Sequence, residues 1–140
     1  MLFRSVGENF AIGILLIEDD DAYREVLANA LVEHGYAVTQ AADGEKGVKL
    51  FRTAPTDLVI TDIVMPNQEG TATIEELHRD YPELGIIAMS GGAAQDPVLY
   101  LKIAGLLGAT RTLEKPFDLP TLLTAIKEVL AATGQDEPAA

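Results

Sequence analysis

The sequence predicts an α/β domain in which a parallel sheet carries helices on both faces. Short apolar runs alternate with helical patterns five times along the 140 residues, and repeated strand–helix units of this kind form parallel sheets. Apolar residues make up 48 % of the chain, which is enough for a buried core and too many for a disordered protein. The length fits one domain, and neither an internal repeat nor a linker interrupts the alternation.

Five apolar runs, each bounded by polar or turn-forming residues, are the predicted strands. In chain order they are residues 13–17, 36–41, 58–61, 85–89 and 109–114. Right-handed connections between parallel strands place all their carboxyl ends on one edge of the sheet. Polar residues that follow the strands can therefore converge there, which is where ligands bind in open α/β sheets.

The first three helices are predicted at residues 21–34, 43–53 and 70–80. Apolar residues of the first repeat at the spacing of one helix face, and Gly35 follows as a C-terminal cap. Asp43 caps the second helix, and Pro55 stops further helix. The third helix ends at Tyr81-Pro82, because a residue before proline disfavours the helical conformation.

The last two helices are predicted at residues 96–107 and 118–131. Asp96 is the expected N-cap of the fourth helix, with Pro97 in its first turn and Gly108 beyond its end. Asp118 stands in a similar place before Pro120 at the start of the fifth helix. A small polar tail follows, which we expect to be disordered.

Composition excludes several classes of function. The net charge of −12 would be repelled by nucleic-acid phosphates, so we expect no direct nucleic-acid binding. The chain has no cysteine, which excludes disulfides and thiolate chemistry. No apolar run approaches the roughly 18 residues of a membrane span, and the first 11 residues lack a signal peptide's apolar stretch. We therefore expect a cytoplasmic protein without membrane insertion.

Polar residues that can carry chemistry follow four of the predicted strands. Glu18–Asp21 are four consecutive acids after the first strand, and Asp62 follows the third. Ser90 ends the fourth strand, and Lys115 follows the fifth. Clustered carboxylates repel one another unless a cation intervenes, and Mg²⁺ prefers carboxylates, waters and phosphate oxygens. The sequence therefore predicts a site for a divalent cation and a phosphoryl group.

The acids have simpler interpretations as well. Asp20 and Asp21 are expected to cap the first helix or to favour its positive end. This explanation fits Glu18 and Asp19 less well, because they directly continue an apolar strand. Asp62 is either a metal ligand or a nucleophile that becomes an aspartyl phosphate.

Lys115 and Ser90 also leave two interpretations open. Lys115 can neutralise a phosphoryl group or form a structural ion pair with a buried acid. Its bond to Pro116 is a candidate for the cis form, although cis is the minority form of X–Pro bonds. Ser90 can donate to a phosphoryl oxygen, with Gly91-Gly92 allowing close approach of backbone amides, or it can be a simple loop residue.

The ordered set of acids, aspartate, serine and lysine-proline is specific as a combination. The chain resembles the receiver domain of bacterial two-component response regulators over about residues 12–130. The matching segments are residues 14–20, residues 62–66 with Gly70, Ser90-Gly91, and residues 115–117. The resemblance implies a flavodoxin-like, three-layer fold whose five parallel strands have the order 2-1-3-4-5, which agrees with the alternation of strands and helices.

The resemblance also implies roles for individual residues. Asp62 would accept a phosphoryl group from a phosphohistidine. The cofactor would be Mg²⁺ or Mn²⁺, bound by Asp19, Asp62 and the backbone carbonyl of Val64, with Glu18 acting mainly through water. Ser90 and Lys115 would each bind a phosphoryl oxygen, so that the protein promotes its own phosphorylation without being a turnover enzyme. A phosphatase of similar fold is disfavoured, because its second aspartate would stand where Val64 is.

Partners and boundaries follow as further expectations. The phosphoryl donor would be a sensor histidine kinase or a phosphotransfer protein, and the output would pass to a downstream protein. We expect an N-terminal extension at 1–11, the receiver at 12–131 and a tail at 132–140, which predicts a stand-alone receiver of undefined oligomeric state. Thr112 occupies the position where many receivers carry an aromatic switch, so a binding module that does not rely on phosphorylation is the alternative.

Overall fold

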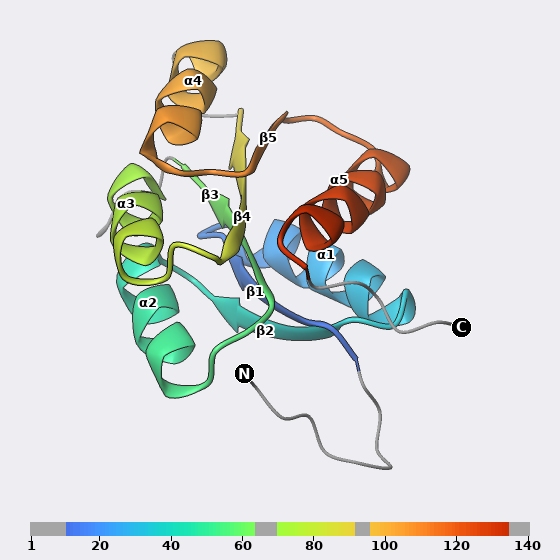
Figure 1. The fold of residues 1–140 in the computed structure, drawn as a ribbon. Helices are drawn as coiled ribbons and strands as arrows, with labels where there is room; N and C mark the ends of the chain where they lie inside the picture. The colour runs from blue at the N-terminus through green and yellow to red at the C-terminus, as the bar shows by residue number, and fades with distance from the viewer. Residues whose placement is uncertain (1–10, 64–69, 92–95, 135–140) are drawn as a thin grey trace.

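A five-stranded parallel sheet forms the centre of the molecule (Figure 1). The computed structural model describes residues 11–63, 70–91 and 96–134. The elements in chain order are β1 (Gly13–Ile17), α1 (Asp21–Glu33), β2 (Ala37–Ala41), α2 (Gly44–Thr53), β3 (Leu58–Asp62), α3 (Gly70–Asp80), β4 (Gly85–Ser90), α4 (Pro97–Leu107), β5 (Arg111–Glu114) and α5 (Leu119–Ala132). The predicted N-terminal extension and tail lie largely outside the described residues.

The strand order is β2-β1-β3-β4-β5, as predicted. In the parallel register, Ile17 lies opposite both Ala41 and Thr61. Asp62 lies opposite Met89, and Ser90 lies opposite Glu114. The strands therefore end almost level with one another, and the residues that follow them share the carboxyl edge of the sheet.

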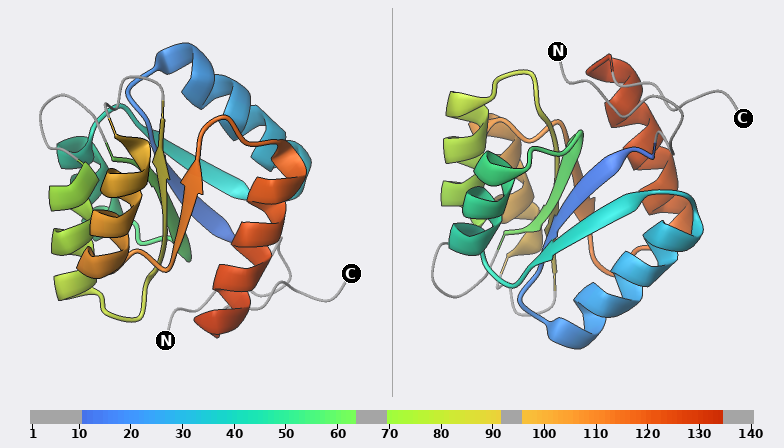
Figure 2. Two further views of the ribbon diagram at one scale, coloured as in Figure 1. Left: turned by 90° about the horizontal axis from the view of Figure 1, so that it is seen from above. Right: turned by 90° about the horizontal axis from the view of Figure 1, so that it is seen from below.

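Helices cover both faces of the sheet, with α1 and α5 on one face and α2, α3 and α4 on the other (Figures 1 and 2). Neighbouring residues of a strand point to opposite faces, so Leu16 and Ile60 pack beneath α1 and α5, whereas Leu15 and Val59 pack beneath the other three helices. β3 is buried along its whole length, because the helix layers cover both of its faces.

Aspartate caps explain where four of the helices begin. The side chains of Asp43, Asp96 and Asp118 each accept a hydrogen bond from the third residue after them, as predicted for N-caps. At α1 the cap is Asp20, whose side chain accepts from the Tyr23 amide, and Asp21 is the first helical residue. The acids after β1 thus divide into a helix cap and its neighbour on one side and Glu18 and Asp19 on the other.

Two strands begin later than predicted, and the same physical cause explains both. The Tyr36 amide donates to the Leu31 carbonyl, and the Ala109 amide donates to the Ala104 carbonyl. These bonds close the C-termini of α1 and α4 beyond Gly35 and Gly108, which have positive φ values of 92° and 123°. Residues expected to open strands are therefore used to finish helices.

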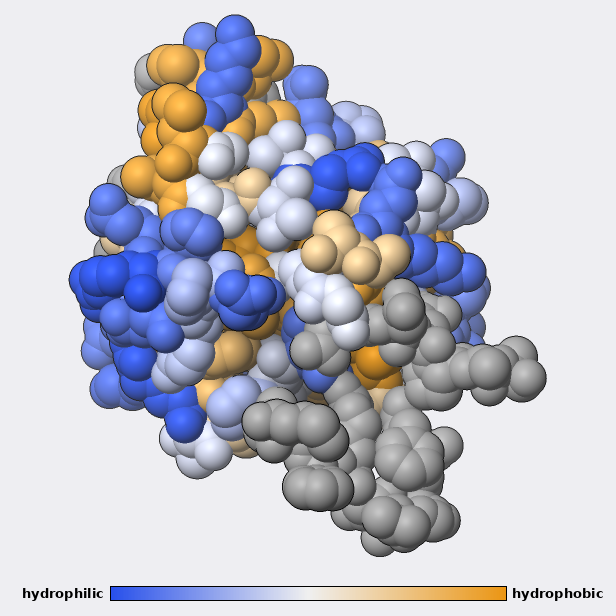
Figure 3. All heavy atoms as spheres, in the orientation of Figure 1, coloured by the Kyte–Doolittle hydropathy of each residue, from blue (hydrophilic) through white to orange (hydrophobic). Residues whose placement is uncertain are grey.

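Exposed apolar side chains gather on α4, which is orange in the surface view (Figure 3). Val98 and Leu99 are about half exposed, and Leu106 is 88 % exposed. Within the described residues, no helix has the length and apolarity that crossing a membrane requires.

Candidate functional site

Three carboxylates meet at the carboxyl edge of the sheet. Glu18 and Asp19 follow β1, and Asp62 is the last residue of the neighbouring strand β3. One carboxylate oxygen from each lies within 4.8 Å of the others. Glu18 and Asp62 are buried, with 1 % and 7 % of their surface exposed, while Asp19 faces solvent. The sequence therefore predicted correctly which acids come together, and oxygen donors at this spacing suit a hard divalent cation.

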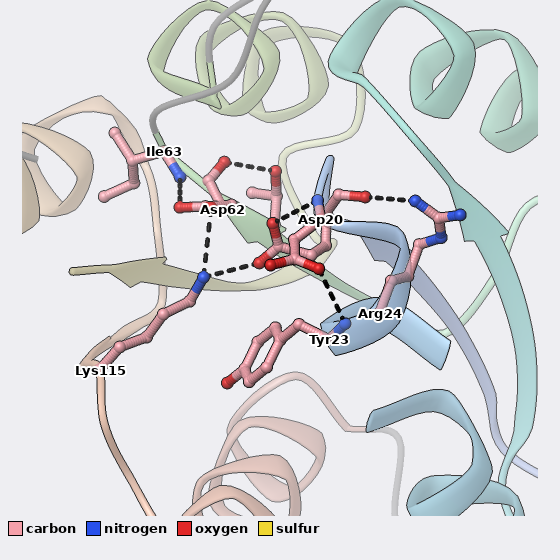
Figure 4. A network of polar contacts seen from close by, with 8 residues as sticks. Asp20, Tyr23, Arg24, Asp62, Ile63 and Lys115 are labelled. Carbon is pink, nitrogen blue, oxygen red and sulfur yellow. Dashed lines mark hydrogen bonds and ion pairs between the residues drawn. The ribbon is translucent and has the colours of Figure 1, made fainter. Parts of the chain in front are cut away.

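Lys115 enters the same cluster from the end of β5. Its Nζ lies 2.6 Å from Oε1 of Glu18 and 3.2 Å from Oδ2 of Asp62 (Figure 4). Its amide donates to the Ser90 carbonyl at 2.7 Å, which continues the pairing of β5 with β4, and its bond to Pro116 is cis. The ion pair with a buried acid that the sequence left as one interpretation of Lys115 is thus present.

The charges in this cluster shift one another's proton affinities. Burial lowers the pKa of Lys115, but its hydrogen bond to Glu18 and the charges of Asp62 and Glu18 outweigh burial and raise that pKa overall. Partial burial raises the pKa of Asp19, and the neighbouring Glu18 raises it further. The cluster thus favours the charged form of Lys115 and disfavours the charged form of Asp19, an effect that a bound cation would oppose.

Asp62 is fixed by contacts on both sides of its carboxylate. Oδ1 accepts from the Ile63 amide at 2.8 Å, while Oδ2 accepts from Lys115. Gly70 packs against the backbone of Asp62 and Ile63, and its amide donates to the Ile63 carbonyl at 2.7 Å. A Cβ atom on Gly70 would overlap the Asp62 carbonyl oxygen and the Ile63 Cα. Val64, the predicted source of a metal-binding carbonyl, lies outside the described residues.

Ser90 is buried and unusual. None of its surface is exposed, and its Oγ has no hydrogen-bond partner among the residues that the structure describes. A buried hydroxyl without a partner costs free energy, so its presence calls for an explanation. The next residue, Gly91, packs so closely on Lys115 that a Cβ would lie 2.6 Å from the Lys115 Cβ. Gly92 lies outside the described residues.

Comparison with known proteins identifies the family. The family model of the response regulator receiver domain matches residues 14–127. This chain belongs to the response regulator receiver domain family. A crystal structure of a CheY-like receiver domain protein from Methanospirillum hungatei JF-1 has a TM-score of 0.80 and 28 % identity, and the match covers 89 % of this chain and 98 % of that one.

Curated relatives place similar receiver domains in longer proteins. Response regulator MprA of Mycobacterium sp. (strain KMS) is 35 % identical over 127 residues, which are 90 % of this chain and 54 % of that protein. Sensor kinase CckA of Brucella abortus (strain 2308) is 34 % identical over 119 residues, which are 84 % of this chain and 12 % of that protein. The chain thus spans about half of MprA and a small part of CckA, and stand-alone signalling stays a prediction.

Two side chains at the receiver site were not singled out from the sequence. Arg24 donates from Nη1 to the Glu18 carbonyl at 2.7 Å and from Nε to the Gln40 side chain at 3.2 Å, so it joins α1 to the ends of β1 and β2. The Tyr23 ring centroid lies 4.6 Å from the Lys115 Nζ. Their place in the first turn of a helix directly behind the acid run is the signal that could have drawn attention to them.

Proposed function

We propose that Asp62 accepts a phosphoryl group from a phosphohistidine of a histidine kinase or a phosphotransfer protein. The observation that carries this proposal is the arrangement around the Asp62 carboxylate, which has Lys115 on one oxygen and two further acids beside it. An Asp62 oxygen would form the bond to phosphorus as the bond from phosphorus to the histidine nitrogen breaks. The nitrogen would keep that electron pair and take up a proton.

Lys115 and Ser90 would stabilise the product. An acyl phosphate carries about two negative charges, and Lys115 already contacts Asp62 with a charged ammonium group. Ser90 follows Met89, the register partner of Asp62, and its hydroxyl, which has no hydrogen-bond partner within the described ranges, has a donor to offer. The free energy lost by leaving this hydroxyl without a partner would be recovered when it binds a phosphoryl oxygen.

The acids would hold Mg²⁺ or Mn²⁺, which supplies positive charge that neutralises the phosphoryl oxygens. Asp19 and Asp62 are the direct ligands in this proposal, with the Val64 carbonyl as a third. Glu18 would act mainly through water, as the resemblance to receiver domains implies. In the structure its Oε1 accepts from Lys115 and its Oε2 from the Asp20 amide at 3.1 Å.

Output would pass through contacts with a downstream protein or through onward transfer of the phosphoryl group. The relatives include a sensor kinase and response regulators, so similar receivers occur in more than one kind of protein. Thr112 is half-buried on β5 and lies opposite Ala88. Because many receivers carry an aromatic switch at this position, Thr112 favours a second candidate function, a binding module that does not depend on phosphorylation. Equal affinity for a partner before and after phosphorylation would support that second function.

Treatment with acetyl phosphate and Mg²⁺ tests the phosphoacceptor directly. Intact-mass measurement should show one added phosphoryl group, released by alkali as expected of an acyl phosphate. The same incubation with excess EDTA should show none, because the phosphoryl charge would then lack a counter-ion. No added mass in the presence of Mg²⁺, in a protein whose circular dichroism shows it folded, would contradict the proposal.

Replacing Ser90 with alanine should separate stability from function. The change removes a buried hydroxyl that has no partner among the described residues, so the free energy of unfolding should stay equal or rise by up to about 1 kcal/mol. Phosphorylation by acetyl phosphate should slow by about tenfold or more, because a donor to the phosphoryl group is lost. Urea unfolding and the time course of intact mass measure the two effects. A clear loss of stability would show that Ser90 has a structural partner.

A further inference from the structure

Among the described residues, the ammonium group of Lys115 contacts two acids and one aromatic ring. Glu18 and Asp62 lie within hydrogen-bonding distance, and the third neighbour is the aromatic ring of Tyr23, with its centroid 4.6 Å from Nζ. In Figure 4 the ring lies on the side of the ammonium away from Asp62. An ammonium group at this distance from an aromatic ring is attracted by the negative charge of the ring face.

The position of this ring is set by the same turn that sets the acids. The Tyr23 amide donates to the Asp20 side chain at 3.0 Å, which fixes the first turn of α1 directly behind Glu18 and Asp19. The side chain is half-buried and packs against the core between the sheet and the α1–α5 layer. The turn thus fixes the Tyr23 backbone beside the acids, and the packing of the side chain on the core places the ring next to the lysine.

Lys115 needs such a surface because of its length and its surroundings. Its four-carbon stem is flexible, and ordering it costs side-chain entropy. Burial also disfavours its charge. Of its two acid partners, Glu18 is the nearer and the more deeply buried. A third contact that uses none of its hydrogen-bond donors would favour the position of Nζ between Glu18 and Asp62.

We propose that Tyr23 is a positioning residue that holds the Lys115 ammonium within reach of Asp62 through its ring face. The inference rests on the proposed phosphorylation of Asp62 and adds a residue to that reaction. The phenol hydroxyl has no part in it. The ring is what matters, because it gives the ammonium a favourable contact that does not compete for its hydrogen-bond donors.

Tyr23→Leu tests the inference, since leucine keeps an apolar side chain that can pack on the core but removes the aromatic ring. Phosphorylation by acetyl phosphate with Mg²⁺ should slow by about three- to tenfold, the range expected for loss of a partly shielded cation–π contact. Tyr23→Phe keeps the ring and should restore most of the lost rate. A Tyr23→Phe variant as slow as Tyr23→Leu would overturn the role of the ring.

Tyr81→Leu is the matched control. Tyr81 is also half-buried and also stacks under a cation, with the Arg52 guanidinium 5.6 Å from its ring centroid, but it lies beyond α3 at the opposite edge of the sheet. Its loss should lower the melting temperature without slowing phosphorylation. Equal slowing by both replacements would mean that the rate follows stability alone, which would overturn the inference.

Lys115→Met supplies the second readout. Tyr23→Leu should have no further effect on the residual rate of Lys115→Met, because the ring acts only through the ammonium group. The same slowing in both backgrounds would show that Tyr23 acts elsewhere. Failure of the unmodified protein to gain a phosphoryl group would contradict the proposed function itself, whereas normal phosphorylation of Tyr23→Leu would contradict only the role of Tyr23.

Discussion

Asp62→Asn should abolish phosphorylation while leaving the protein folded. An amide has no charged oxygen with which to attack phosphorus, so the rate of phosphoryl addition should fall by at least about a thousandfold, the scale on which loss of a nucleophile acts. Stability should not suffer, because the change removes one of three clustered carboxylates and Lys115 keeps its contact with Glu18. Intact mass after incubation with acetyl phosphate and Mg²⁺ measures the first effect, and thermal melting the second.

Asp57→Asn is the control for this experiment. Asp57 is also a buried aspartate, but it precedes β3 at the other edge of the sheet, where its Oδ2 accepts from the Gly13 amide at 2.7 Å. This variant should gain the phosphoryl group as the unmodified protein does. Continued phosphorylation of Asp62→Asn would transfer the acceptor role to another acid, and mapping the labelled peptide would then identify it.

Gly70→Ala should cause the largest loss of stability. The added Cβ would overlap the Asp62 carbonyl oxygen and the Ile63 Cα and would lie 2.9 Å from the Asp62 carbonyl carbon. All three are backbone atoms of one strand end, so no side chain can turn away to make room. Overpacking of this kind typically costs about 1–3 kcal/mol, and we expect the upper part of that range. Phosphorylation should slow as well, because the displaced backbone carries the Asp62 carboxylate.

Gly105→Ala is the matched control for Gly70→Ala. Gly105 lies on the exposed side of α4, and a Cβ there would meet nothing within 4 Å. Alanine should stabilise this helix by about 0.5–1 kcal/mol, because glycine loses more conformational freedom on folding. Urea unfolding of the two variants should therefore give changes of opposite sign. A neutral Gly70→Ala would show that the close approach of Gly70 to Asp62 does not exist in solution.

Local sequence patterns predicted most of the fold. Asp43, Asp96 and Asp118 cap their helices because a cap needs only the side chain of one residue and the amides just after it. The late starts of β2 and β5 were missed for a related reason. Tyr36 and Ala109 are apolar and continue a strand pattern, but their amides donate to carbonyls at helix ends. An apolar pattern does not show to which carbonyl an amide will donate.

The convergence of Glu18, Asp19, Asp62 and Lys115 also followed from the sequence, because residues that follow parallel strands must share one edge of the sheet. The partners within that cluster did not follow. Lys115 lies closer to Glu18 than to Asp62, and this choice depends on how β5 sits beside β4.

The contacts that α1 and α3 make with the site also could not be predicted from the sequence. The Tyr23 ring reaches Lys115, and Gly70 reaches the backbone of Asp62, only because helices dock on the sheet at particular depths and angles. No pattern of neighbouring residues encodes those depths, since they result from side chains of many elements filling one core. Sequence patterns thus determine the fold and which chemical groups lie at the carboxyl edge of the sheet. The packing of helices on the sheet determines which contacts hold those groups in place.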